Sequence, residues 1–425
     1  MSRSRSLGVV LLVMMTLVSS CATPASTVIP AITQTSPPPP LPTETFAPTI
    51  EPTIAASPTP AVTAPATPGG PALYLPIGLA CVPSAGVLVD YYDFQGQKLG
   101  ELQSPNLGTG LYQQAHLAGP LTYSPSPVLP PLVFYAFDNG GELWLNSGGD
   151  LSLIKAEPNL FSLVGIPGQP TLAFSLPQYT DAGVRSLVYI GDAQSLPTSD
   201  PVLDSTNSMS YAVKLLAVAS VDSQPAGIWY TTVPYGIGGD IVYEPRSGLY
   251  YLDLSALTIN NYLDLTKRPA GFSYDQSWVA YEPNNGNGPL SIVHNFESST
   301  TISYPMREDS NRGAGDAVFS PDNAYVAWRE AGGSLMDQPS TFHQTIRIAS
   351  VNGTIITEIP DSSLLNAAGF SGIGSAIPVG WLDTQTLVLE VKDMSGTQSI
   401  ILKVNLDGTG LASLASGSFL GFLYP

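Results

Sequence analysis

The residue types that most often do chemistry in proteins are few in this chain and lie far apart. Its three histidines are His116, His294 and His343, and none has a second histidine, a cysteine or an acid at the spacing of a metal site. The sequence contains no Gly-x-Ser-x-Gly, the pattern that presents a serine nucleophile in α/β-hydrolases. We therefore expect no metal, no cofactor and no catalytic residue set, and a binding protein rather than an enzyme.

Two short segments carry oxygen atoms of the kind that calcium prefers, residues 138–142 and 146–150. Neither has the alternating first, third and fifth ligands of a calcium loop, so we interpret both as hairpin turns. Ser273, Asp275 and Trp278 resemble the Asp-box of sialidases, although Ser277 stands where that motif has glycine. We interpret Asp275 as a turn residue.

The elements that position these residues are short strands. Pro321-Asp322-Asn323 is typical of a tight turn, because proline presets φ and the Asx side chains accept local hydrogen bonds. Asn352-Gly353 predicts a type I′ hairpin turn, since both residues tolerate positive φ. The sequence thus predicts four antiparallel strands, at residues 317–320, 325–329, 345–351 and 354–359.

This four-strand unit is repeated. Residues 271–281 overlay residues 318–328 without a gap, with Phe272 standing 47 residues before Phe319. A looser copy begins at residue 380 and has Asp407-Gly408 where the best copy has Asn352-Gly353. A repeat of this length is typical of propeller blades.

Residues 319–328 follow the pattern aromatic-Ser-Pro-Asp and then aromatic-Val-Ala-aromatic, which resembles the repeats of TolB-like (WD40-like) β-propellers. The resemblance implies an all-β fold built as a single β-propeller. At about 50 residues per blade, residues 73–425 would form about seven four-stranded blades, with six or eight also compatible. A hairpin is predicted over residues 86–102. Further strands are predicted at 132–137, 142–145, 171–176, 186–190, 211–219, 227–231, 240–244 and 249–254, with a turn at Arg246-Ser247-Gly248.

The N-terminus reads as a bacterial secretory signal. Arg3 and Arg5 precede an apolar run over residues 7–18, and Leu17-Val-Ser-Ser-Cys21 resembles a lipobox. This resemblance implies a signal peptide over residues 1–20 and a lipid on Cys21, which anchors an extracytoplasmic protein to the membrane of the cell envelope. Residues 21–72 are rich in Pro and Thr and predict a disordered, extended stalk.

Charge excludes one class of partner. The chain has 15 Lys and Arg against 33 Asp and Glu, a net charge of −18, so a nucleic acid would be repelled. Of the two cysteines, Cys21 is assigned to the lipid, and Cys81 is left without a disulfide partner. We expect Cys81 to be a buried, small apolar residue.

Strand direction alternates within a blade, so the connections after strands two and four share one face and the tight hairpins share the other. We name the first the long-loop face; it receives residues 266–270, 306–316, 331–344 and 361–378. We name the second the hairpin face; it receives the turns at 321–323, 352–353 and 407–408. Several of the chain's few cations gather on the long-loop face with nearby acids, and the predicted ligand-binding residues are Lys267, Arg268, Arg307, Glu308, Arg312 and Asp316.

These observations favour a binding or scaffold module for a protein, a peptide or a glycan on the long-loop face. The alternative is a glycan hydrolase or lyase, which needs two carboxylates about 5 to 10 Å apart, for example among Asp240, Glu308 and Asp316. A third possibility, which only the repeat resemblance implies, is a structural envelope component of the TolB-like type.

Overall fold

The computed structural model describes the chain from Gly78 to Tyr424 with gaps. The described residues are 78–82, 88–103, 115–117, 121–122, 133–136, 142–147, 150–156, 160–165, 171–192, 200–221, 224–236, 242–284 and 286–424. All of them belong to one compact unit, residues 63–425. The predicted signal peptide, Cys21 and the stalk lie outside the described residues.

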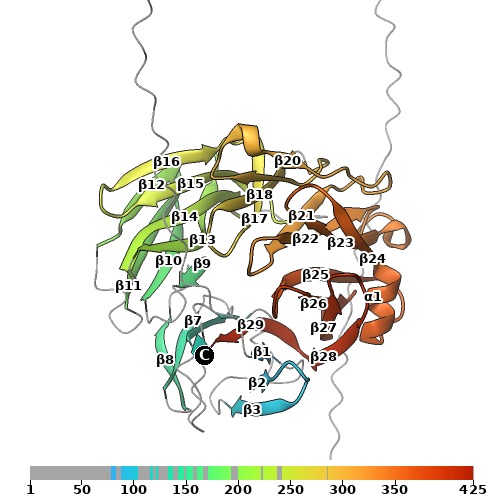
Figure 1. The fold of residues 1–425 in the computed structure, drawn as a ribbon. Coiled ribbons are helices and arrows are strands. Elements are labelled where there is room, and N and C mark those ends of the chain that lie inside the picture. The colour runs from blue at the N-terminus through green and yellow to red at the C-terminus, as the bar shows by residue number, and fades with distance from the viewer. Residues whose placement is uncertain are drawn as a thin grey trace, which may run out of the picture. The chain divides into compact units, whose positions relative to one another are not determined.

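The described strands form seven sheets, and six of these are four-stranded and antiparallel (Figure 1). In each, the strands are adjacent in nearly the order in which the chain makes them, which is the pattern of a propeller blade. The first two sheets are β4 (Ala115–Leu117), β6 (Val133–Ala136), β7 (Glu142–Ser147) and β8 (Asp150–Ala156), then β9 (Ser162–Gly165), β10 (Thr171–Thr180), β11 (Gly183–Asp192) and β12 (Leu203–Asn207). The third and fourth are β13 (Tyr211–Val221), β14 (Gln224–Pro234), β15 (Ser247–Asp253) and β16 (Thr258–Leu263), then β17 (Lys267–Phe272), β18 (Trp278–Pro283), β19 (Ser291–His294) and β20 (Ile302–Ser303). The last two are β21 (Ala314–Phe319), β22 (Tyr325–Gly332), β23 (His343–Ser350) and β24 (Ile355–Pro360), then β25 (Gly374–Trp381), β26 (Thr386–Asp393), β27 (Ser399–Asn405) and β28 (Ala412–Ser416).

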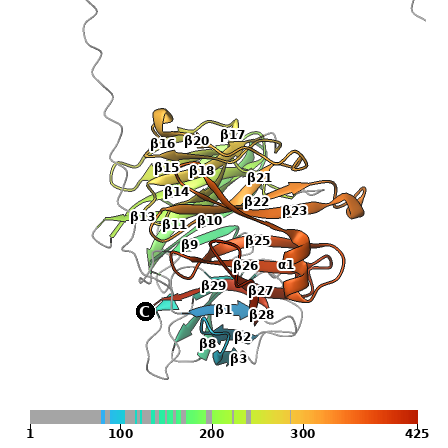
Figure 2. The ribbon, with the colours of Figure 1, turned by 45° about the vertical axis from the view of Figure 1, so that its right-hand side comes forward.

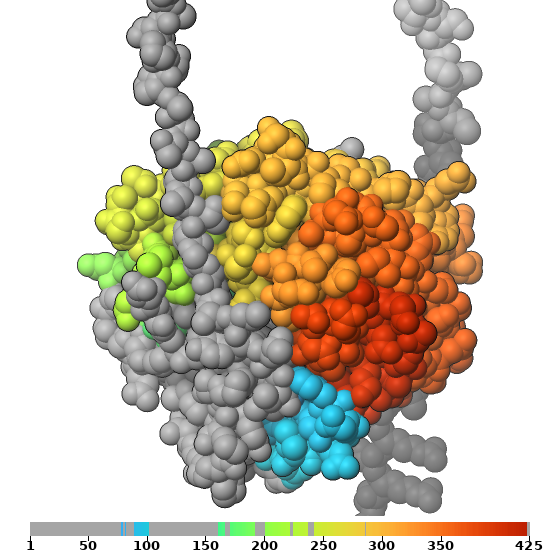
Figure 3. Space-filling model, in the orientation of Figure 1, coloured from blue at the N-terminus to red at the C-terminus, as the bar shows by residue number. Residues whose placement is uncertain are grey.

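The remaining sheet joins the two ends of the described chain. Its order is β3 (Lys98–Gln103), β2 (Leu88–Tyr92), β1 (Gly78–Val82), β29 (Ser418–Tyr424) and β5 (Leu121–Thr122). The last strand β29 pairs antiparallel with the first strand β1, and both views show them side by side (Figures 1 and 2). In the space-filling view the segment around β2 and β3 lies directly against the C-terminal part (Figure 3). A sheet shared by the first and last strands closes the fold, and the whole arrangement fits a β-propeller.

The core lies between neighbouring sheets. One buried cluster joins the β21–β24 sheet to the β25–β28 sheet through residues such as Ile348 and Leu389, and another joins β25–β28 to Leu79 and Cys81 of β1. Similar clusters link the β9, β13, β17 and β21 sheets in turn. Cys81 is fully buried, as predicted, and burial raises the pKa of its thiol.

The repeat aligns as predicted. Phe272, Phe319 and Trp381 are the last residues of β17, β21 and β25, the first strands of their sheets. Phe319 and Trp381 are 7% and 4% exposed, and each belongs to a cluster shared with the preceding sheet. The indole Nε1 of Trp381 donates to the carbonyl of Val318 on β21 at 3.3 Å.

The observed turns confirm the predicted hairpins but show that one turn type was predicted wrongly. Asp275 and Asp322 act alike, since each accepts from a serine hydroxyl two residues earlier, at 2.7 and 2.6 Å. At Asn352-Gly353 only Gly353 has positive φ, +99°, so the predicted type I′ turn is wrong. The amide of Gly353 donates to the Ser350 carbonyl, so the turn is centred on Val351 and Asn352 and the glycine is its fourth residue.

Two other expectations fail locally. Residues 242–246 of the predicted strand and turn are not in a strand, and Ser247 and Gly248 already belong to β15. The long connection after β24 contains an α-helix, α1 (Asp361–Ala368), that the strand pattern did not predict. Residues 298–300 and 339–341 are short 3₁₀ turns. Among the described residues no helix has the length and hydrophobicity needed to cross a membrane.

Candidate binding face

Strand order places the long-loop face at the start of β13, β17, β21 and β25 and at the end of β14, β18, β22 and β26. Arg268, the second residue of β17, lies at this end of its sheet but below the surface, with 6% exposure. It forms an ion pair with the fully buried Glu282 of β18, and its Nη2 donates to the Ala314 carbonyl at 2.8 Å. Glu282 also accepts from the Ala314 amide at 3.1 Å. Burial lowers the pKa of Arg268 to about 10. The predicted ligand residue Arg268 therefore joins two sheets from within.

Tyr243 connects the loop after β14 to the β21–β24 sheet. Its hydroxyl donates to the carbonyls of Gly313 and Arg329, at 3.0 and 3.1 Å. The guanidinium groups of Arg268 and Arg329 lie 4.6 and 4.8 Å from the centre of its ring, a cation–π arrangement. Burial raises the pKa of the Tyr243 hydroxyl. Gly315 is required opposite the ring, because a Cβ there would lie 2.5 Å from it. This loop is thus fixed against a sheet that begins some 70 residues later in the sequence.

Asp316, another predicted ligand residue, is also used internally. It has a φ of +54°, and its carboxylate pairs with Arg329 Nη2 at 2.6 Å. Arg329 in turn donates to the Val242 carbonyl at 2.8 Å and to Ser375 Oγ at 3.0 Å. One guanidinium therefore ties together the loop after β14, the start of β21 and the start of β25.

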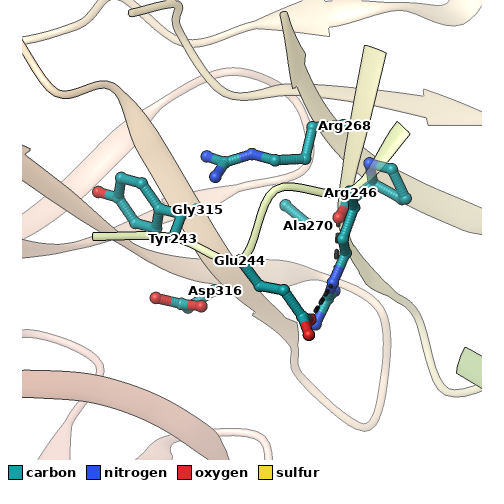
Figure 4. A pocket seen from close by; sticks show the side chains of 8 residues that line it. Tyr243, Glu244, Arg246, Arg268, Ala270, Gly315 and Asp316 are labelled. Atoms are coloured by element: carbon teal, nitrogen blue, oxygen red, sulfur yellow. Dashed lines mark hydrogen bonds and ion pairs between the residues drawn. The ribbon is translucent and has the colours of Figure 1, made fainter. Parts of the chain in front are cut away.

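A small polar pocket lies among these groups (Figure 4). It is lined by Tyr243, Glu244, Arg246, Arg268, Pro269, Ala270, Gly315 and Asp316 and has a volume of about 20 Å³. That is the space of about one water molecule, so the pocket is too small for a sugar or a peptide side chain. Burial opposes the charge of Glu244, but Arg246 and Lys214 pair with it and hold its pKa below the usual value.

Around Arg307 the charges reach the surface. Arg307 pairs with Asp309 at 3.1 Å and with Glu358 of β24 at 2.8 Å. The hydrogen bond from Arg307 lowers the pKa of Asp309, which His343 also contacts at 3.4 Å. Beneath them Arg347 pairs with the buried Glu330, at 2.7 Å, so the exposed network rests on a buried ion pair.

The other predicted residues have mixed positions. Glu308 is exposed, and Arg312 Nη1 donates to the Gly333 carbonyl at 3.4 Å. Lys267 Nζ lies 3.7 Å from Asp264 and 5.3 Å from the centre of the Tyr281 ring. The structure therefore brings Arg307, Glu308 and Arg312 to one stretch of the long-loop face.

The three carboxylates suggested for the enzyme alternative differ in their surroundings. Asp240 lies outside the described residues, Glu308 is exposed, and Asp316 is paired with Arg329. Of the histidines, His294 packs on Trp278 with ring centres 4.7 Å apart, and nothing is described of the His116 side chain. Among the described residues no group of three His, Cys, Asp or Glu could hold a metal ion.

Sequence reasoning missed a surface on the long-loop face that we name the aromatic patch. It consists of the ring cluster of Phe161, Tyr179 and Tyr235 together with Met209, whose neighbour Ser210 accepts a hydrogen bond from the Tyr235 amide at 2.9 Å. Tyr179 and Met209 are 65% and 66% exposed. The Tyr235 ring lies 5.0 Å from Tyr179 and 5.5 Å from Phe161, and the Tyr179 hydroxyl donates to the Tyr235 carbonyl at 3.0 Å. Tyr179 lies in β10, whereas Phe161, Met209 and Tyr235 lie in connections, directly before β9, shortly before β13 and directly after β14. No local sequence pattern marks them. The four residues have one feature in common, which is that each lies at or near a strand end on the long-loop face.

No family model matches the sequence, and no curated protein matches it. A solved structure from a study of two prolyl endopeptidases aligns with a TM-score of 0.49 and 8% identity, over 80% of this chain and 50% of that chain. Oligogalacturonate lyase from Vibrio parahaemolyticus aligns with a TM-score of 0.42 and 9% identity, over 82% and 86%. TolB from Acinetobacter baumannii aligns with a TM-score of 0.36 and 13% identity, over 81% and 80%. The chain spans half the length of the peptidase that it matches, and the fold described above rests on its own strand pairing.

Proposed function

We propose that this protein is a lipid-anchored, extracytoplasmic β-propeller of seven blades that binds a protein, a peptide or a glycan on its long-loop face. In this proposal the five-stranded sheet is the seventh blade. Its four blade strands are β29, β1, β2 and β3 in order, and the two-residue β5 pairs in parallel along the other edge of β29. The six four-stranded sheets are the other blades.

The observation that carries the binding proposal is the aromatic patch of Phe161, Tyr179, Met209 and Tyr235. Aromatic residues and methionine are enriched at interfaces, where they supply large contact area at a small cost in conformational entropy. Two of these side chains are about two-thirds exposed, although their apolar parts would gain from burial. A partner that covers Tyr179 and Met209 would supply that burial.

The buried ion pairs also support binding on the long-loop face. The ion pairs of Arg268 with Glu282 and of Arg329 with Asp316 hold the connections in place from below. A surface that is already ordered loses less entropy when it binds, so the same contacts give a higher affinity. Arg307 and Lys267 already pair with Asp309, Glu358 and Asp264, so a partner with anionic groups would share these cations with the acids of this face.

The position of the first strand supports the anchor geometry. Strand β1 begins at Gly78, which is paired with Leu423 near the end of β29, so the N-terminal chain joins the propeller at the hairpin face. A lipid on Cys21 would then tether the protein from its hairpin face and leave the long-loop face free of the stalk.

The anchor is tested with Cys21→Ala. We expect the variant to leave the membrane fraction and to run at a different mature mass, because no thiol remains to receive the lipid. A variant that stays membrane-bound at unchanged mature mass would refute the anchor.

Binding is tested by pull-down from envelope extract with the full chain as bait. A partner bound at the aromatic patch should be retained by the unaltered protein and lost, at least tenfold, by the double variant Tyr179→Ser with Met209→Ser. The matched control is Leu257→Ser, which removes an equally exposed apolar side chain, 66%, from a hairpin-face turn. Loss of the partner with the control, and retention with the double variant, would place binding on the other face.

The cations are tested with the same bait. Arg307→Ala combined with Arg312→Ala should weaken binding of the partner, and added salt should weaken it too. Charge changes at Asp322 and Asp407, in hairpin-face turns, should leave binding unchanged. Equal effects of both pairs would remove the cations from the proposed surface.

A further inference from the structure

A second, larger pocket opens on the hairpin face, where the innermost strands end. It has a volume of about 240 Å³ and is lined by Phe272, Tyr274, Ala317, Val318, Phe319, Pro321, Val379, Gly380, Trp381 and Phe422. Five of these are aromatic, and they come from the ends of four strands, β17, β21, β25 and β29, or directly after them. The repeat thus supplies one aromatic wall per sheet.

The walls of this pocket are held in place. Phe319 and Trp381 are nearly buried, and the indole Nε1 of Trp381 bonds to the Val318 carbonyl at 3.3 Å. Gly380 lets Phe422 approach, because a Cβ at that position would lie 2.4 Å from its ring, and its φ of +151° suits glycine. The pocket is therefore a formed apolar concavity, smaller than the usual site of a drug-sized ligand.

The chemistry of these walls fits proline. Grooves lined by aromatic side chains bind proline-rich segments in the polyproline II conformation, which is extended before binding and therefore loses little entropy. The chain itself contains such a sequence directly before the propeller. Residues 63–71 read Thr-Ala-Pro-Ala-Thr-Pro-Gly-Gly-Pro, and the Gly-Gly pair is a turn signal that lets a chain reverse.

The N-terminal chain also enters the fold beside this pocket. Gly78 pairs with Leu423, and Leu79 pairs with Phe422, whose ring lines the pocket. Only residues 72–77 separate the proline-rich segment from β1, a reach of roughly 20 Å at about 3.1 Å per residue. We propose that residues 63–71 of the same chain occupy the hairpin-face pocket and fix the angle at which the N-terminal chain leaves the propeller.

The test uses the full-length chain with p-benzoylphenylalanine in place of Tyr274. Irradiation should cross-link this position to residues 63–71 at the mass of a single chain, as mapped by mass spectrometry. The same photoreactive residue in place of Tyr179, on the long-loop face, should give no such cross-link. Cross-links at the mass of two chains, or none to residues 63–71, would overturn the proposal.

Proline variants make the test specific. Pro65→Ser, Pro68→Ser and Pro71→Ser together should reduce the cross-link at least fivefold. The matched control, Pro37→Ser, Pro38→Ser and Pro39→Ser, changes as many prolines farther from Gly78 and should leave the yield unchanged. An unchanged yield in the first variant, or an equal loss in the control, would show that the pocket does not select this segment.

Discussion

At the scale of single residues, charge in this protein serves mainly to order the loops from below. Arg268 and Glu282 are both buried and form an ion pair, and Glu282 accepts a further bond from the Ala314 amide. A cation that looks like a surface residue in the sequence can therefore be a buried one. The Arg268 guanidinium packs against the ring of Tyr243, 25 residues earlier in the chain. Local sequence patterns carry no information about that contact.

The buried pair makes Glu282 a sensitive position. Glu282→Gln should lower the free energy of unfolding by about 3–5 kcal/mol, since it leaves the Arg268 charge buried and unpaired. Urea unfolding followed by circular dichroism measures this. The control is Glu101→Gln, which removes an exposed partner of Lys98 and should change stability by less than about 1 kcal/mol. Similar small losses in both variants would mean that Arg268 is not desolvated.

Turn aspartates give the protein a defined response to acid. The Thr409 hydroxyl and amide lower the pKa of Asp407 below its ordinary value of 3.8, and the Ala256 amide does the same for Asp253. A group whose pKa is lower in the folded state stabilises the fold above the unfolded pKa, and this stabilisation disappears as the pH falls through the folded value. The melting temperature should therefore be steady above about pH 5 and fall below about pH 4. Asp407→Asn should flatten this fall, and a melting temperature that rises on acidification would contradict the assignment.

At the scale of elements, the hairpin positions and the repeat could be predicted from local sequence, whereas one turn type and the segments fixed by tertiary contacts could not. The hairpins at Asp322 and Asp407 and the repeat of Phe272 and Phe319 follow from local turn chemistry and period, and the structure has them where they were predicted. Residues 242–244 were predicted as the end of a strand, but they are not in a strand, and Tyr243 instead bonds to the Gly313 carbonyl. Helix α1 was missed because its eight residues bury only Leu364 and Leu365 and show little apolar pattern.

The repeat predicts how much stability is lost when Phe319 is truncated. Phe319→Ala should lower the free energy of unfolding by about 3–5 kcal/mol, because it leaves a cavity between two sheets. Leu265→Ala, at a 52% exposed position, is the control and should cost little. A loss below about 1 kcal/mol at Phe319 would mean that the residue does not belong to the core.

At the scale of the whole molecule, the two faces of the propeller differ in what they offer. The long-loop face carries the Tyr179 and Met209 patch and the Arg307 network, whereas the hairpin face has short turns and receives the N-terminal chain beside Phe422. The fold class and the existence of two unlike faces could be predicted from the sequence. The aromatic patch could not be predicted, because its residues are far apart in the sequence and come together only when β9, β10 and β13 pack in the fold.

Hydrogen–deuterium exchange of the full chain, with and without the partner captured from envelope extract, shows which face binds. We expect slower exchange on the long-loop face, in residues 179–183, 208–211 and 234–236, because bound surface loses its access to water. Exchange in the hairpin-face turns at 254–257, 321–324 and 352–354 should not change. Protection confined to these turns would contradict the account.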